Sequence, residues 1–365
     1  MLSPSNTRAA RITITSCDQT VRQVTNNNDV KINLFWWDFI FIQKVTFFAA
    51  NSGYSFDWGL TVHNRLKIMN SSMHFDKVLK QFLLIAFVVF PFSIAFGQPL
   101  TEIVLFDLKI SGDEISAVNG SNITLHPGAY DNQPFFHPDK ELMYYASADD
   151  AGRTDIRVYD YKSKQTSSLT KTTEREYSPT VTPDKKFVSC IIQRDNGAQD
   201  LGKYPIDGGE ATVIINNLTI GYHAWLDDRT LFMFVLGEPA TFHQYNVNNK
   251  TDSIRAMDIG RSLLRIPGTA AVSFVQKAKD GRWTINQIDG RGTISVIGET
   301  ISGREDIAWV PGGRMLMTDG RTVYVGKPGT TSWKEIKISS VVYLKNITRL
   351  AVSADGSKLA LVIEE

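Results

Sequence analysis

Residues 132–170 read NQPFFHPDKELMYYASADDAGRTDIRVYDYKSKQTSSLT, and this stretch decides the fold. It contains a short apolar run that ends in a Pro-Asp turn, a second apolar run, a turn at Gly152, a third run and a fourth run rich in Ser and Thr. Residues 177–215, YSPTVTPDKKFVSCIIQRDNGAQDLGKYPIDGGEATVII, present the same features in the same order. A unit that recurs at a fixed period predicts a repeat architecture.

The turn after the first short run recurs six times along the chain. Proline presets φ for the second position of a turn and Asp or Gly suits the next, so each marker predicts a hairpin with a strand on either side. Successive markers are 45, 43, 41, 44 and 43 residues apart. The six markers are Pro138-Asp139, Pro183-Asp184, Leu226-Asp227, Pro267-Gly268, Pro311-Gly312 and Ala354-Asp355.

Four runs of strand length are expected in each complete unit. The second runs, such as Phe187–Gln193, are the most apolar and are bounded by turn residues, as is typical of buried strands. The fourth runs are more polar, and in the fifth unit the expected fourth strand covers Lys334–Ile338. Four strands in roughly 43 residues is the period of a β-propeller blade.

The sixth unit stops at Glu365, after its second strand, but the missing outer strands have candidates near residue 100. Thr101–Leu108 (TEIVLFDL) matches the third-strand text TDIRVYDY at Thr154–Tyr161, and Asn122–Leu125 is the expected fourth strand. The N-terminal strands of the mature chain would then complete the last blade and close the ring. We therefore predict an all-β fold, a six-bladed β-propeller formed by residues 98–365.

The composition allows a large core and excludes several classes of function. The chain has 365 residues, 42% of them hydrophobic and 21% charged, with a formal net charge of +1. Without blocks of basic residues, nucleic acid is not expected as a partner. The two cysteines, Cys17 and Cys190, cannot form a disulfide framework or a CxxC metal site. Cys190 lies in an apolar run, which predicts a buried thiol.

Residues 73–97 have the three parts of a secretory signal peptide. Lys77 and Lys80 supply a basic region, residues 82–96 are apolar, and Ala95-Phe96-Gly97 places small residues before a cleavage at Gln98. The apolar run of about 15 residues is shorter than the roughly 20 that a membrane-spanning helix needs. We therefore expect cleavage and no stable membrane insertion, with a retained anchor as the alternative.

A signal peptide must lie near the start of a nascent chain, yet this one begins at Met73. We therefore expect translation to start at Met73, and residues 1–72 to be a disordered upstream extension that the functional protein lacks. The alternative is a genuine N-terminal extension that is disordered. The expected domain organisation is thus an extension at 1–72, a signal peptide at 73–97 and the propeller at 98–365.

The phrases QPFFHPDKELMYYAS, SPTVTPDKKFVSCII and VSADGSKLALVI resemble the PD40 or WD40-like repeat, whose core reads P-x-F-S-P-D-G-K before a strand. The chain from residue 98 onward is similar to the TolB-like six-bladed propeller, which also occurs as the non-catalytic domain of prolyl-oligopeptidase-type enzymes. The third, fourth and fifth units depart from the Pro-Asp pattern. The resemblance implies a bacterial protein that is periplasmic or secreted.

Motifs for catalysis are scarce in the sequence. The GxSxG pattern of a serine hydrolase is absent. The histidines after residue 98 form neither an HxH nor an HExxH pattern, so they predict no metal site. Asp149, Asp150 and Asp155 surround Gly152 without the spacing of an EF-hand, and we interpret them as a hairpin turn. We expect no catalytic residue, no resident metal and no cofactor.

The segments that lead into the first strand of each blade are the candidates for function, because that strand lies beside the central channel. They combine aromatic residues with charges of both signs, as is typical of a recognition surface. The alternative is that these loops are simply polar and solvated. The candidate binding residues are Tyr130, Asp131, Asn132, Arg175, Glu176, Tyr177, Tyr222, His223, Arg304, Glu305 and Asp306.

These observations predict a module that binds a protein or peptide partner, with the cell envelope as its expected location. The first alternative is a hydrolase or lyase in which Asp131, Glu176 and Asp306 hold a divalent metal ion in the channel. The second is an accessory module of a larger surface assembly. Propellers include both binding proteins and enzymes, so the fold alone does not decide among these functions.

Overall fold

The computed structural model describes residues 11–15, 23–25, 30–33, 44–48, 55–57 and 99–365. The chain divides into two compact units, Met1–Ser93 and Ile94–Glu365. The predicted signal peptide lies outside the described residues, and the interpretation of residues 1–72 stays a prediction. The strands of the first unit form a sheet in the order β2-β1-β3-β4-β5, with β1 at Arg11–Thr15, β2 at Gln23–Thr25, β3 at Val30–Asn33, β4 at Lys44–Phe48 and β5 at Ser55–Asp57.

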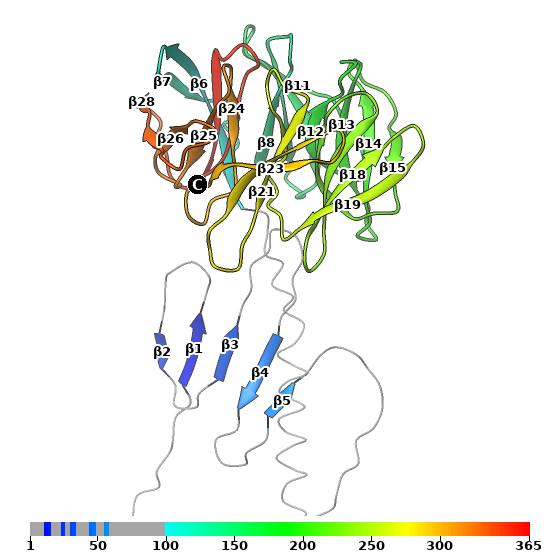
Figure 1. Cartoon of the computed structure of the whole chain (residues 1–365), viewed down its shortest axis with the longest axis vertical. Helices are drawn as coiled ribbons and strands as arrows, with labels where there is room; N and C mark the ends of the chain where they lie inside the picture. The colour runs from blue at the N-terminus through cyan, green and yellow to red at the C-terminus, as the bar shows by residue number, and fades with distance from the viewer. Residues whose placement is uncertain (1–10, 16–22, 26–29, 34–43, 49–54, 58–98) are drawn as a thin grey trace, which may run out of the picture. The chain divides into compact units, whose positions relative to one another are not determined.

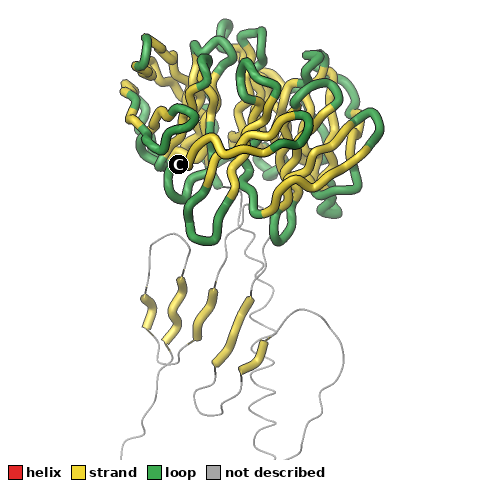
Figure 2. The backbone as a smooth tube through the Cα atoms, in the orientation of Figure 1, coloured by secondary structure: helices red, strands yellow, loops and turns green. Residues whose placement is uncertain are grey.

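The second unit forms six sheets, which are the blades of a β-propeller (Figure 1). This confirms the fold predicted from the repeats. Strands and loops make up this unit throughout residues 99–365 (Figure 2). Over the ranges that the structure describes, no helix is long and apolar enough to cross a membrane.

Blades 1 to 5 each use four consecutive strands, and the first strand lies innermost. Within a blade the strands are antiparallel, so the start of the first strand and the connection between the second and third strands lie at the same end of the channel. The blades are β8 (Asp131–Phe136), β9 (Leu142–Ala148), β10 (Thr154–Asp160) and β11 (Gln165–Ser168); β12 (Arg175–Val181), β13 (Phe187–Gln193), β14 (Gln199–Pro205) and β15 (Thr212–Ile215); β16 (Ile220–Trp225), β17 (Thr230–Val235), β18 (Thr241–Asn246) and β19 (Thr251–Met257); β20 (Leu264–Arg265), β21 (Ala271–Gln276), β22 (Thr284–Asp289) and β23 (Ile294–Glu299); and β24 (Ala308–Val310), β25 (Arg314–Thr318), β26 (Val323–Gly326) and β27 (Lys334–Glu335).

Blade 6 joins the two ends of this unit. Its inner strands are the last two of the chain, and β30 pairs antiparallel with β6 from Lys358↔Asp107 to Glu364↔Thr101. Figure 1 shows β6 and β7 in cyan beside the red C-terminal strand. From the inside outward the blade is β29 (Ile347–Val352), β30 (Lys358–Glu364), β6 (Thr101–Ser111), β7 (Glu114–Asn122) and β28 (Lys337–Ser340).

Two strand predictions were wrong. The strand after β6 is Glu114–Asn122 and not Asn122–Leu125, because the chain reverses at once through Gly112, whose φ is +57°. The predicted strand Lys334–Ile338 divides at Ile336, which is buried in a core shared by blades 5 and 6. Residues before Ile336 pair within blade 5, and those after it pair in parallel with β7 of blade 6.

The Pro-Asp markers form turns, as predicted. In blade 2 the Thr182 hydroxyl donates a hydrogen bond of 2.6 Å to the Asp184 carboxylate, which also accepts the Lys186 N–H at 3.1 Å. Asp149 likewise accepts the N–H groups of Ala151 and Arg153, so the segment around Gly152 is a hairpin turn, as predicted. These carboxylates complete local backbone hydrogen bonding, which is what keeps the short turns in place.

Neighbouring blades are joined by apolar packing and by a repeated polar contact. Trp225 donates its indole N–H to the Ser189 hydroxyl at 2.8 Å, and Trp309 donates in the same way to Ser273. Each pair joins an innermost strand to the second strand of the preceding blade. Cys190 is fully buried in the core between blades, as predicted, and burial raises the pKa of its thiol.

Candidate functional site at the channel mouth

Each blade places one side chain near the start of its innermost strand, between three residues before the strand and its third residue. Blades 1, 2 and 3 contribute tyrosines, whereas blades 4, 5 and 6 contribute two arginines and an aspartate. Successive members are 47, 45, 39, 45 and 43 residues apart, close to the period of the repeat. This channel cluster consists of Tyr130, Tyr177, Tyr222, Arg261, Asp306 and Arg349.

The channel cluster is joined across the ring axis. Arg349 of blade 6 donates a hydrogen bond of 2.8 Å to the phenolic oxygen of Tyr222, and its guanidinium lies 5.2 Å from the centre of that ring. Blades 3 and 6 face each other in a six-bladed ring, so this contact spans the channel. Tyr130 and Tyr177 complete the aromatic side with an edge-to-face contact whose ring centres are 6.4 Å apart.

The opposite side of the channel holds a network of ion pairs. The Asp306 carboxylate lies 2.9 Å from Nη2 of Arg261 and 3.5 Å from Nη1 of Arg349. Glu305 accepts the Arg261 backbone N–H at 3.0 Å and pairs with Lys277 at 2.8 Å. Burial alone would raise the pKa of Asp306, but the charges of the two arginines outweigh it and lower that pKa. Asp306 is therefore ionised at neutral pH.

A cavity of about 100 Å³ opens beside this network. Arg304 is the exposed cation on its rim and donates a hydrogen bond to the Asp319 carbonyl oxygen. The cavity is well below the roughly 300–1,000 Å³ of sites that enclose small molecules. It is lined by Arg261, Gly303, Arg304, Glu305, Asp306, Thr318, Ile347 and Thr348.

Hydrogen bonds between successive innermost strands hold the wall of the channel. The Gln133 side chain accepts the Ser178 N–H at 2.7 Å, and the Ser178 hydroxyl donates to the Gly221 carbonyl at 3.2 Å. Gln133 and Ser178 both adopt left-handed backbone conformations, with φ of 59° and 53°. Such conformations persist where the surrounding structure over-determines them. The strand starts that carry the tyrosines are therefore held in a fixed geometry.

Strand alternation turns two of the predicted residues away from the channel, because consecutive side chains point to opposite faces. Glu176 points into blade 2, where it accepts hydrogen bonds from Thr172 at 2.7 Å and Tyr204 at 2.9 Å. His223 lies between blades 2 and 3, with its Nε2 2.6 Å from the Ser189 hydroxyl. Burial lowers the pKa of His223 to about 3, so it is a neutral packing residue.

Asp131 and Asn132 lie at the seam between blades 6 and 1. The Asn132 amide donates to the Thr101 hydroxyl at 3.3 Å. Asp131 is 1% exposed, lies 3.7 Å from His126, and has one carboxylate oxygen without a hydrogen-bond partner among the described residues. Burial raises the pKa of Asp131 to about 6, against a smaller opposing effect of a hydrogen bond from Ser147.

The remaining predicted residues lie at the rim or in the charged network. Arg175 pairs with Asp195 at 3.2 Å on the rim of blade 2. The structure thus brings together Tyr130, Tyr177, Tyr222, Arg304, Glu305 and Asp306 at one mouth.

The three acids considered for a metal site do not form one. Asp131 contacts His126 at the seam, Glu176 is held inside blade 2, and Asp306 is paired with two arginines. Throughout the part of the chain that the structure describes, no group of three or more metal-ligating side chains could hold an ion. The donor set needed for a divalent metal in the channel is therefore not assembled by these residues.

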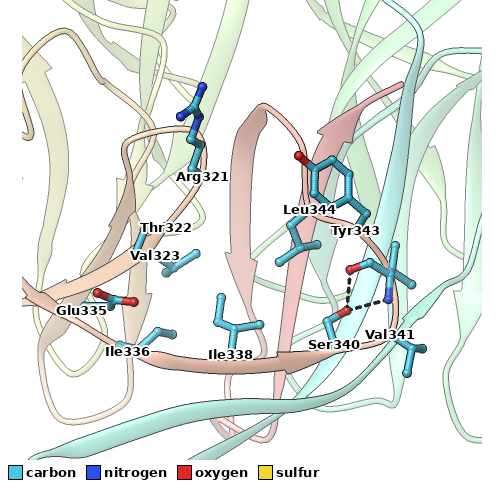
Figure 3. Close-up of a pocket in the computed structure, with 11 residues that line it drawn as sticks. Arg321, Thr322, Val323, Glu335, Ile336, Ile338, Ser340, Val341, Tyr343 and Leu344 are labelled. Atoms are coloured by element: carbon cyan, nitrogen blue, oxygen red, sulfur yellow. Dashed lines mark hydrogen bonds between the residues drawn. The ribbon is translucent and has the colours of Figure 1, made fainter.

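A second cavity, of about 460 Å³, lies where the chain passes from blade 5 to blade 6 (Figure 3). The connecting segment that carries Ile336 and Ile338 forms one side, and Ser340 bonds through its hydroxyl to both backbone groups of Val342. Tyr343 projects there with 82% of its surface exposed. No member of the channel cluster lines this cavity.

Sequence reasoning missed Arg261, Lys277 and Arg349. Arg349 occupies the same point of the repeat as Tyr222, because each pairs with the fifth residue of the second strand, so superposing the units would have found it; Arg261 lies just before the innermost strand of blade 4. They were missed because neither stands in a phrase of mixed aromatic and charged residues. Lys277 lies after the second strand of blade 4, and nothing in its local sequence separates it from other surface lysines.

The geometry can be compared with that of known proteins. No family model and no curated protein matches the sequence. A putative TolB from Agrobacterium tumefaciens has a similar structure, with a TM-score of 0.56 and 13% identity over 74% of this chain and 99% of that chain. Weaker matches are an oligogalacturonate lyase in complex with manganese, with a TM-score of 0.49 and 14% identity over 67% of this chain and 80% of that one, and TolB from Acinetobacter baumannii, at 0.47 and 12% over 92% and 79%. At these identities the likeness is one of fold, and the second unit of this chain is a six-bladed β-propeller like that of the putative TolB.

Proposed function

We propose that this protein is an exported propeller that binds a segment of a protein or peptide at the channel mouth. The observation that carries the proposal is the channel cluster, which gathers one side chain from every blade at a single point. Tyrosine and arginine are, with tryptophan, the residue types enriched among the few residues that dominate the binding energy of protein interfaces. Here three buried tyrosines line one half of the channel behind the mouth, and an ion-pair network forms the other half.

The shape of the mouth favours a polypeptide segment over an enclosed small molecule. The Arg349–Tyr222 bridge crosses the channel, and the cavity beside it has a volume of about 100 Å³. A ligand at this point therefore lies over the mouth and inserts one group. Arg304, which is exposed, is placed to contact the part of the ligand that remains outside.

Binding can be tested by panning a displayed library of random peptides on the full-length chain. Dissociation constants of the selected peptides are then measured by calorimetry for the wild type and for Arg304→Ala. We expect Arg304→Ala to weaken binding about 10-fold, equivalent to about 1.4 kcal/mol. Failure to select any peptide, or selected peptides that bind Arg304→Ala as tightly as the wild type, would contradict the proposal.

Arg291→Ala is the matched control. Arg291 is likewise an exposed arginine, and it pairs with the Asp289 carboxylate at 3.2 Å. It lies on the turn between β22 and β23, at the end of blade 4 opposite the start of the innermost strand. Peptides bound at the mouth should bind Arg291→Ala with unchanged affinity.

Export to a bacterial periplasm or medium is the second part of the proposal, and it rests on the sequence of residues 73–97. N-terminal sequencing of the exported chain tests it directly. We expect Gln98 as the first residue. A chain that begins before residue 73, or that stays with the cytoplasmic fraction, would contradict it.

A further inference from the structure

We propose that a cavity at the end of the ring opposite the channel mouth binds the carboxylate or phosphate group of a small anion. This cavity, called here the turn cavity, lies between blades 5 and 6 and is lined by residues 112–113, 311–314 and 327–328. Its volume of about 440 Å³ is within the roughly 300–1,000 Å³ of sites that hold small molecules. No member of the channel cluster lines it, so this inference is independent of the proposed function.

Three connections between strands enclose the turn cavity. Residues 311–313 join β24 to β25, residues 112 and 113 join β6 to β7, and residues 327 and 328 follow β26. The strands of a blade alternate in direction, so all three connections lie at the end where the innermost strand of blade 5 finishes. A Cβ atom added at Gly112, Gly312 or Gly313 would meet no atom within 4 Å, so the space beside these turns is open.

Arg314 supplies the cation of the turn cavity that lacks a counter-ion. It is the first residue of β25 and faces blade 6, because Leu316, two positions along the strand, packs in the core shared by blades 5 and 6. Among the described residues its guanidinium forms no ion pair, and its Nη1 is buried without a hydrogen-bond partner. A buried cationic donor without a partner is unfavourable, and an anion in the cavity would compensate it.

The other two charges that line the turn cavity satisfy each other. Nζ of Lys327 lies 2.8 Å from Oδ1 of Asp113, and both side chains are largely exposed. The hydrogen bond from Lys327 is the main cause that lowers the pKa of Asp113, with a smaller contribution from the charge of Arg314. Glu114, next in the chain, and Lys334, whose charge also acts on Asp113, add one charge of each sign. The charge of Arg314 therefore remains in excess.

The lining of the turn cavity suits an oxyanion that is attached to a small organic group. The planar fork of an arginine donates two parallel hydrogen bonds to a carboxylate or a phosphate. Pro311 and Pro328 add two rings that carry no N–H donor. The volume corresponds to about fifteen water molecules at roughly 30 Å³ each, which leaves room for an organic group beside the anionic one.

Calorimetry on the full-length chain with phenyl phosphate, benzoate and inorganic phosphate tests the site. We expect anion binding that Arg314→Gln weakens about 10-fold, because the guanidinium supplies both the charge and the hydrogen bonds. Arg291→Gln is the matched control and should leave binding unchanged, because Arg291 lies on a turn at the same end of blade 4 and is paired with Asp289. Phenyl phosphate that binds more tightly than inorganic phosphate identifies an organic anion as the ligand, and equal binding identifies the free ion.

Two exposed variants keep the test informative if Arg314→Gln does not fold. Asp113→Asn frees the Lys327 ammonium and should strengthen anion binding about 3-fold, whereas Lys327→Gln should weaken it by about the same factor. Circular dichroism of each variant checks that it is folded. The inference is overturned if none of the three anions binds, if folded Arg314→Gln binds them as tightly as the wild type, or if Asp113→Asn and Lys327→Gln fail to shift the affinity in opposite directions.

Discussion

Nη2 of Arg349 donates a hydrogen bond of 2.8 Å to the phenolic oxygen of Tyr222, two residues separated by 127 positions in the chain. The bond joins the innermost strands of blades 6 and 3, on opposite sides of the channel. Arg349 also lies 3.5 Å from Asp306 of blade 5. Because its guanidinium has partners on two other blades, it is fixed before any ligand arrives, which lowers the cost of ordering the mouth upon binding.

Tyr222→Phe removes only the oxygen that accepts this hydrogen bond. The buried guanidinium of Arg349 then loses a partner, and we expect the free energy of unfolding to fall by about 1–3 kcal/mol. Urea denaturation of the full-length chain measures the change. Tyr343→Phe is the control, because Tyr343 is exposed and should tolerate the loss of its hydroxyl. Equal stability of the two variants would show that the bridge contributes nothing to the fold.

Asp306→Asn removes the negative charge between Arg261 and Arg349. Removing one partner of a buried ion pair typically costs about 3–5 kcal/mol, and we expect a loss of up to this order in denaturant titrations. The pH dependence has a definite sign. Folding lowers the pKa of Asp306, so its ionised carboxylate stabilises the folded state fully above the usual pKa of an aspartate. This stabilisation is lost as the pH falls through the lowered pKa.

Asp280→Asn provides the comparison for Asp306. Asp280 pairs with Arg282 at 2.8 Å, but both side chains are largely exposed. Exposed ion pairs contribute little to stability, so this variant should unfold at the same denaturant concentration as the wild type. A loss at Asp306 no greater than that at Asp280 would mean that the network in the channel is as well solvated as the surface.

The repeat made the fold predictable, because turn chemistry and four runs of strand length recur together at the period of a propeller blade. Phe187–Gln193 was predicted with the bounds that the structure gives it. The prediction failed where tertiary contacts override local pattern. Burial of Ile336 between two blades divides a run that reads as a single strand, and the reversal at Gly112 moves the outer strand of blade 6 toward the N-terminus.

The candidate site was predicted only as far as chain position allows. Being next to an innermost strand is enough to place Tyr130, Tyr177, Tyr222 and Asp306 at the mouth. It does not say which member of a consecutive pair faces the channel, and His223 beside Tyr222 shows that alternate residues face the neighbouring blade. The repeat register would have placed Arg349 at the point that Tyr222 occupies in blade 3, but its contact across the ring leaves no trace in the local sequence.

The burial of His223 predicts sensitivity to acid. Its pKa is lowered from 6.5 to about 3, so the unfolded chain takes up a proton before the folded chain does. Stability from this group is complete above pH 6.5 and falls as the pH drops toward 3, with a slope approaching about 1.4 kcal/mol per pH unit. His223→Phe should remove this slope. Denaturant titrations between pH 7 and pH 4 measure this slope. The prediction is contradicted if the free energy of unfolding depends on pH in the same way for the wild type and for His223→Phe.

The burial of Asp131 predicts the opposite behaviour at the seam between blades 6 and 1. Its pKa is raised to about 6 in the folded protein, so the carboxyl ionises more readily in the unfolded chain. Above pH 6 the buried carboxylate therefore destabilises the folded state. Asp131→Asn should therefore raise the free energy of unfolding above pH 6, by about 1–3 kcal/mol for a shift of this size. The gain should shrink as the pH falls toward 4, where the wild-type carboxyl is protonated in the folded state.

Asp289→Asn is the contrasting variant for this measurement. The Asp289 carboxylate accepts backbone N–H groups of Thr293 and Arg291, the first of which is the main cause of its lowered pKa. Its replacement removes a favourable charge and should give no gain at any pH. If Asp131→Asn instead destabilises the protein at pH 8 as much as at pH 4, His126 at 3.7 Å or another neighbour satisfies the charge. The buried acid would then be a fixed part of the seam that closes the ring.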